Sequence, residues 1–130
     1  MGQYGSRAYR VPARLTKTQH LSFAGHIAVE FVLGAALAAS AVALGFDEGT
    51  LIAALALGLL LASSAVGINV FGSRVGMHKS WDRVLVSLLL AATIASAIAA
   101  PGVATLVFGA AAAIEATLLV FTHYVPERRG

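Results

Sequence analysis

The stretch from Ser22 to Leu44, SFAGHIAVEFVLGAALAASAVAL, decides the fold of this chain. It contains a single carboxylate and no lysine or arginine. A helix of roughly 20 apolar residues, rising ~1.5 Å per residue, crosses a hydrocarbon core of ~30 Å. We therefore expect this stretch to span a membrane. The run is longer than a signal-peptide core and no polar domain follows it, so we expect it to stay in the protein.

Three further apolar stretches occupy residues 50–71, 83–100 and 103–124. Hydrophobic residues make up 58% of the chain and charged residues 12%, a balance that soluble domains do not show. The sequence thus predicts an all-α integral membrane protein, a four-transmembrane-helix bundle over residues 22–124. A basic segment, 1–21, precedes the bundle, and a short tail, 125–130, follows it.

The polar breaks between these stretches predict how the helices begin. Gly45 to Gly49 forms a turn whose acids, Asp47 and Glu48, complement the dipole of the second helix. Ser80 or Asp82 is expected to cap the third helix. The third and fourth helices are separated only by Pro101 and Gly102, which predicts that they are antiparallel neighbours.

All lysines and arginines lie on one side of the predicted membrane. They precede the first helix, occupy the middle loop and close the chain: Arg7, Arg10, Arg14, Lys17, Arg74, Lys79, Arg83, Arg128 and Arg129. The positive-inside rule then places both termini in the cytoplasm, in a bacterial-type inner membrane. We expect the four N-terminal cations to contact anionic lipid and Trp81 to anchor the interface. These topological roles account for the basic residues without a nucleic-acid partner.

The first and third helices suggest an internal repeat. At an offset of 56 residues, 33–45 (LGAALAASAVALG) matches 89–101 (LLAATIASAIAAP) at several positions. The protein would then consist of two helical hairpins in parallel repeat. Chance similarity between alanine-rich helices is the alternative.

Small and polar residues predict the faces on which the helices pack. On the first helix we expect His26, Glu30, Gly34 and Ala38 to face protein, and Phe23, Ile27 and Phe31 to face lipid. The corresponding packing residues of the second helix are Gly58, Ala62, Ala65, Asn69 and Gly72. Those of the third are Ser87, Ala91, Ala95 and Ala99. Such thin helices are expected to enclose no large cavity.

Glu30 and Glu115 are candidate functional residues, because ionisable groups inside a membrane are costly. Both lie at a similar predicted depth, so they can share a proton or bind a cation. His26 and His123 extend the group toward the cytoplasm, and together the four residues could form a proton half-channel or part of a metal site. We assign no metal ligands from the sequence. A structural role, with each carboxyl hydrogen-bonded to Asn69 or Thr117, is the alternative. His20 and His78 are interpreted as surface residues.

Other chemistry finds little support in the sequence. The chain has no cysteine, which excludes disulfides and thiolate metal sites. It contains no nucleotide loop, HExxH or nucleophile elbow, so we expect no enzyme and no cofactor, with His26 and His123 as a minor candidate pair for haem. The leading hypothesis is a non-enzymatic accessory or assembly subunit of a homo-oligomer or larger membrane complex. The alternative is an oligomeric proton- or cation-coupled transporter or channel that uses Glu30 and Glu115.

Overall fold

A computed structural model describes residues 21–71, 75–122 and 124, with side chains described outside 67–76. Four α-helices follow one another: α2 (Phe23–Ala43), α3 (Glu48–Phe71), α4 (Val75–Ala99) and α5 (Val103–Phe121). All four are long and apolar enough to span a membrane. The prediction of an all-α, four-helix membrane bundle is confirmed.

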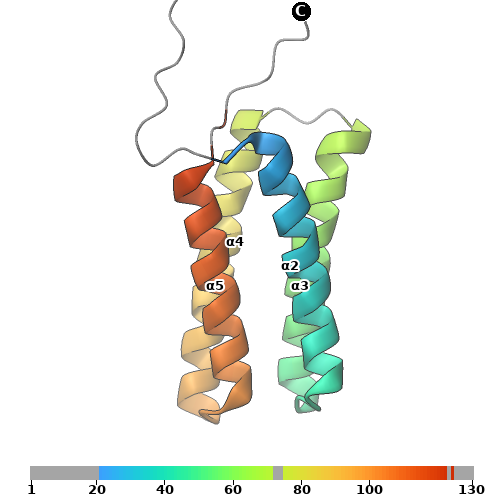
Figure 1. Ribbon diagram of the computed structural model, residues 1–130. Coiled ribbons are helices and arrows are strands. Elements are labelled where there is room, and N and C mark those ends of the chain that lie inside the picture. Colours follow the sequence, from blue (N-terminus) through green and yellow to red (C-terminus); the bar gives the residue numbers. More distant parts are fainter. Residues whose placement is uncertain (1–20, 72–74, 123, 125–130) are drawn as a thin grey trace, which may run out of the picture.

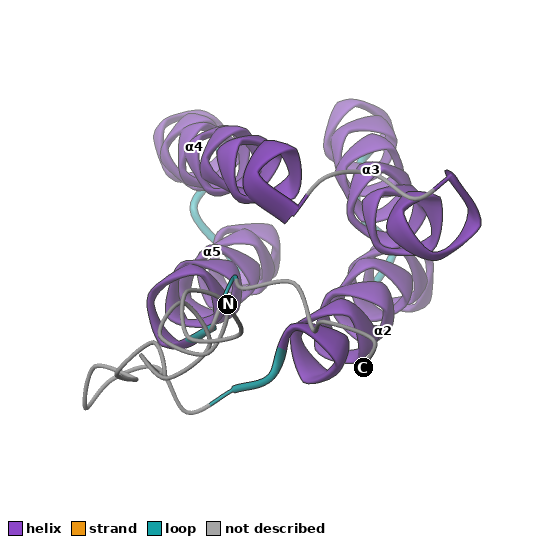
Figure 2. Ribbon diagram, turned by 90° about the horizontal axis from the view of Figure 1, so that it is seen from above, coloured by secondary structure: helices purple, strands orange, loops and turns teal. Residues whose placement is uncertain are grey.

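The helices form two antiparallel hairpins that stand side by side (Figure 1). α2 packs mainly on α3, and α4 packs mainly on α5, while smaller contacts join α2 to α5 and α3 to α4. Viewed along the helices, α2 and α4 occupy opposite corners of the bundle (Figure 2). We call the end at which α2 begins and α5 ends the polar end. α3 also ends there, and α4 begins there.

Local sequence explains where α2 and α3 begin. The Ser22 hydroxyl accepts a hydrogen bond from the Gly25 amide at 3.1 Å and so caps α2. Gly45 adopts a positive φ of 64° in the turn that follows α2, a conformation that glycine tolerates best. Hydrogen bonding with the Thr50 side chain holds the pKa of Asp47 below its ordinary value at the start of α3. Glu48 occupies the first turn of α3, as predicted.

The predicted start of the third helix is wrong. α4 begins at Val75 rather than at residue 83, so Ser80 and Asp82 lie inside the helix and cannot cap it. The polar run from Met77 to Arg83 contains no proline or glycine, and its residues are compatible with a helix. Polarity there does not mark a break in the helix.

Two glycines bring α2 and α3 into close contact. A Cβ atom added to Gly34 would lie 2.5 Å from the Gly58 carbonyl oxygen, and one added to Gly58 would lie 2.6 Å from the Gly34 carbonyl oxygen. The relationship is reciprocal, because each glycine makes room for the backbone of the other. Small residues therefore allow the approach predicted for this pair of helices.

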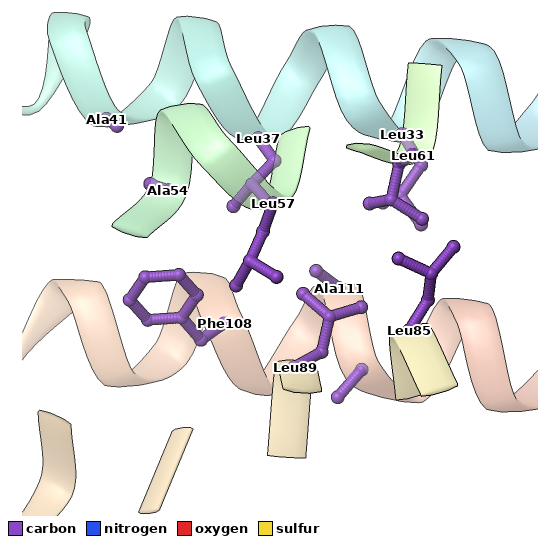
Figure 3. Close-up of a cluster of buried hydrophobic side chains, with 11 residues drawn as sticks. Leu33, Leu37, Ala41, Ala54, Leu57, Leu61, Leu85, Leu89, Phe108 and Ala111 are labelled. Carbon is purple, nitrogen blue, oxygen red and sulfur yellow. The ribbon is translucent and has the colours of Figure 1, made fainter. Parts of the chain in front are cut away.

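Apolar side chains from all four helices fill the interior of the bundle. The cluster comprises Leu33, Leu37, Ala41, Ala54, Leu57, Leu61, Leu85, Leu89, Phe108, Ala111 and Ala112. Figure 3 shows Leu33, Leu61 and Leu85, from three different helices, close together at one end of this cluster. They lie one helical turn beyond the polar residues described below.

The predicted packing faces were partly wrong. His26, Glu30 and Gly34 are buried as expected, and Phe31 is exposed, but Ile27 is buried and Phe23 is half-buried. On α4 the expected packing residues Ser87, Ala91, Ala95 and Ala99 are all exposed. The buried face of α4 carries Asp82, Leu85 and Leu89 instead. Burial of the carboxylate and of the large leucines sets the rotation of α4, whereas alanines fit either face.

Candidate metal centre

Two of the helices carry the same pair of residue types at the same spacing. α2 carries His26 and Glu30, and α4 carries His78 and Asp82. Residues four apart on a helix lie one above the other on a single face. Both faces point into the bundle, and all four side chains are buried, with exposed fractions of 4% or less. We call these four residues the tetrad.

The tetrad joins opposite corners of the bundle near its polar end. His78 Nε2 lies 2.9 Å from Glu30 Oε2 and 3.1 Å from Asp82 Oδ1. His26 Nε2 lies 3.0 Å from Asp82 Oδ2 and 3.6 Å from Glu30 Oε2. One ligand atom from each residue lies within 4.8 Å of all the others. Nitrogen and oxygen donors therefore converge on one point from two helices.

His78 Nε2 forms a hydrogen bond with Glu30 Oε2, but other donor atoms of the tetrad have no hydrogen-bond partner among the described residues. Within the described part of the chain, His26 Nε2, Glu30 Oε1 and Asp82 Oδ1 are buried without a well-formed hydrogen bond, although His26 Nε2 lies 3.0 Å from Asp82 Oδ2 and Asp82 Oδ1 lies 3.1 Å from His78 Nε2. A buried polar atom without a hydrogen bond is costly and requires an explanation. Two imidazoles and two carboxylates are a donor set that suits zinc, iron(II) or manganese(II). The residues present thus fit a divalent transition-metal ion.

Thr122 orients the imidazole of His26. Its hydroxyl donates to the Leu118 carbonyl and lies 2.7 Å from His26 Nδ1. Because the hydroxyl proton is already used, Nδ1 must carry the hydrogen and donate to Thr122. Nε2 then faces the carboxylates of Glu30 and Asp82, and a metal ion bound there would take the place of a hydrogen on that nitrogen. A backbone hydrogen bond of 3.1 Å from the Leu21 amide to the Phe121 carbonyl holds α5 against the start of α2.

The other tetrad residues also have supporting contacts. His78 Nδ1 lies 3.4 Å from the Ser64 hydroxyl of α3. The Tyr124 hydroxyl donates to Asp82 Oδ2 at 2.7 Å. Burial and the hydrogen bond with Asp82 raise the pKa of the Tyr124 phenol, so the phenol stays a proton donor at neutral pH. Lys79 Nζ lies 5.3 Å from the centre of the Tyr124 ring, within range of a cation–π contact.

Aromatic and aliphatic side chains enclose the tetrad from two sides. The Phe23 ring stacks on His26 at 5.9 Å between centroids and meets the His78 ring edge-on at 5.5 Å. One turn deeper, Leu33 follows Glu30 along α2 and Leu85 follows Asp82 along α4, both in the apolar cluster. The tetrad therefore lies above a leucine layer that separates it from the far end of the bundle.

The structure sorts the predicted site residues into three groups. Glu30 and His26 belong to the tetrad, and Glu115 is fully buried in α5, near enough to Glu30 and Asp82 to interact electrostatically. Asn69 lies in α3, but its side chain falls outside the described residues, as do His123 and the basic residues Arg7, Arg10, Arg14 and Lys17. Trp81 is 40% exposed near the polar end.

Three earlier interpretations need correction. His78, read as a surface residue, is only 4% exposed and is part of the tetrad. Thr117 is exposed and its hydroxyl donates to the Ala113 carbonyl, so it is not a partner of Glu115. His26 Nε2 faces carboxylates, an environment that does not fit an axial haem ligand.

A sequence signal for the tetrad existed at a different offset. His26, Glu30, Leu33 and Leu37 match His78, Asp82, Leu85 and Leu89 at a separation of 52 residues, and all eight are buried. The predicted repeat used an offset of 56, one helical turn away. The polar pair and the leucines below it, rather than the alanines, mark the equivalent positions that the structure brings together.

Comparisons with protein families, with curated proteins and with solved structures found no match to this chain. The function is therefore inferred from the geometry of the tetrad.

Proposed function

We propose that this is a small, non-enzymatic membrane protein that binds a divalent transition-metal ion through His26, Glu30, His78 and Asp82. The convergence of their four donor atoms within 4.8 Å is the observation that carries the proposal. Two neutral imidazoles and two carboxylates balance the charge of one divalent ion. This balance is important in a site surrounded by apolar side chains, where a net charge is costly.

The positive-inside rule supports a cytoplasmic location for the polar end, in an inner membrane, so the ion would enter from the cytoplasm. Phe23 covers the tetrad on that side and would have to move for the ion to enter. The leucine layer beyond the tetrad favours binding over conduction through a single bundle. Movement of the ion across the membrane would require an oligomer or a rearranged bundle.

A bound metal ion is compatible with the accessory role predicted from the sequence. Large apolar side chains on the outside of the bundle, such as Val32, Leu59 and Ile98, are 64%, 68% and 81% exposed. Lipid covers such surfaces, and so do neighbouring membrane subunits. A metal-loaded bundle could thus serve as a subunit of a homo-oligomer or larger complex, with the ion fastening its two hairpins together.

Equilibrium dialysis of the purified protein against zinc tests the proposal. The wild type should hold at least one zinc ion per chain, and a His26→Ala, His78→Ala double variant should lose affinity by at least about 100-fold, since two of four ligands are removed. The matched control replaces the other two histidines, His20 and His123, with alanine and should keep zinc. Equal affinity in all three proteins would refute the tetrad as the metal site.

A further inference from the structure

Glu115 is a third buried acid, and it is not part of the tetrad. It lies in α5 with no exposed surface, and among the described residues neither of its carboxyl oxygens has a hydrogen-bond partner. A buried carboxyl is normally paired or coordinated, because burial removes its water. The position therefore requires a partner that no described side chain supplies.

Glu115 lies somewhat deeper in the bundle than Glu30. It precedes Thr122 by seven residues, which places it ~10 Å deeper along α5 than the contact between Thr122 and His26. Glu30 follows His26 by four residues and lies ~6 Å deeper along α2. α2 and α5 are neighbours, and the Glu115 carboxyl interacts electrostatically with Glu30.

Glu115 nevertheless stays outside the tetrad. Its oxygens are not among the donor atoms that lie within 4.8 Å of one another. Glu30 meets both histidines through Oε2, whereas its Oε1 atom is buried without a hydrogen bond in the part of the chain described. Glu30 Oε1 and both carboxyl oxygens of Glu115 thus have no partner among the described residues, and they lie on the inner side of the tetrad.

We propose that Glu115 and Glu30 Oε1 hold a second divalent cation, so that Glu30 bridges a pair of metal ions. This inference rests on the proposed function, because the first ion of the pair is the tetrad's. Two-metal sites commonly place their ions ~3.5–4 Å apart, a separation that one bridging carboxylate spans.

The donor chemistry of the second position differs from that of the tetrad. It offers only carboxylate oxygens, which suit a hard cation such as manganese(II), with water completing the coordination. Two divalent ions carry four positive charges, and the carboxylates of Glu30, Asp82 and Glu115 carry three negative charges. The pair of sites would therefore keep one net positive charge. A hydroxide formed from a metal-bound water would neutralise that charge, because metal ions make such water acidic.

Manganese stoichiometry and electron paramagnetic resonance of the full chain in detergent test the inference. The wild type should bind two manganese ions per chain and give a spin-coupled spectrum. Glu115→Gln should bind one ion and give the six-line spectrum of isolated manganese(II). Thr105→Val is the matched control, since the Thr105 hydroxyl is another buried, unpaired group of α5; this variant should keep both ions and the coupled spectrum.

The outcomes separate this inference from the proposed function. One manganese ion per chain in both the wild type and Glu115→Gln, with an uncoupled spectrum, would overturn the second site and leave the tetrad intact. A wild type that binds neither manganese nor zinc would overturn both. The wild-type spectrum alone decides the matter if Glu115→Gln fails to fold, because an uncoupled spectrum at saturating manganese contradicts a bridged pair.

Discussion

His26 of α2 and Thr122 at the end of α5 are joined by a 2.7 Å contact between Nδ1 and the threonine hydroxyl. The same hydroxyl donates to the Leu118 carbonyl, so His26 Nδ1 carries a hydrogen and donates it to Thr122. The two residues are 96 positions apart in sequence, and their contact connects the first helix of the bundle with the end of the last one. Nε2 is left on the side of the ring that faces Glu30 and Asp82.

Replacement of Thr122 with valine should weaken zinc binding by about 10- to 100-fold, because the imidazole loses the acceptor that orients it. The bundle should keep its helical content, which circular dichroism checks, while competition with a zinc chelator measures the affinity. Thr117→Val is the matched control, since Thr117 is exposed and bonds only within its own helix. Equal affinities for the two variants would contradict the orienting role of Thr122.

Zinc should stabilise the protein against thermal unfolding. A ligand that binds only the folded state adds about 2.7 kcal/mol at a free concentration 100 times its dissociation constant. We therefore expect the melting temperature to rise with zinc and to fall again when a chelator removes the metal. His78→Ala should show a much smaller zinc-dependent rise. A rise of the same size in this variant would mean that zinc stabilises the protein from elsewhere.

The contact between Gly34 and Gly58 predicts that the smallest substitution will disturb the first hairpin. Gly34→Ala should destabilise the bundle by about 1–3 kcal/mol, because the new methyl group meets the Gly58 backbone. The matched control is Gly49→Ala in α3, where the nearest atom to an added Cβ lies 3.8 Å away. That variant should be neutral or slightly stabilised. Thermal unfolding in detergent measures both, and similar melting temperatures would argue against the close crossing.

The orientation of the bundle can be tested because the natural chain has no cysteine. Asp47→Cys introduces a thiol in the turn between α2 and α3, and Met77→Cys introduces one near the polar end, where Met77 is 66% exposed. A membrane-impermeant maleimide should label Asp47→Cys in intact cells, and should label Met77→Cys only after the cells are permeabilised. The opposite pattern would place the polar end outside the cytoplasm.

The length of the apolar stretches was enough to predict the four spans, because the thickness of the hydrocarbon core sets a minimum helix length. Glu30 and Glu115 could also be singled out, since any carboxylate within a span is costly. His78 and Asp82 cannot be found in the same way, because they precede the apolar part of α4 in a polar stretch whose composition is typical of a loop.

The rotation of α4 could not be predicted from its alanines. Ala91, Ala95 and Ala99 form a small-residue stripe, yet all three are exposed, whereas Leu85 and Leu89 are buried. In a chain with small residues on every face, such a stripe carries little information. The polar pair one turn before the leucines was the more reliable guide, because a buried carboxylate needs a partner and so determines which face points inward.

The central claim is that two histidines and two carboxylates from α2 and α4 hold one metal ion. Zinc X-ray absorption on the Glu115→Gln variant, which should bind a single ion, tests this claim most directly. We predict two imidazole nitrogens at about 2.0–2.1 Å and two carboxylate oxygens at about 2.0–2.2 Å, with one imidazole lost when His78→Ala is added. A zinc shell without imidazole scattering, or no retained zinc, would contradict the account.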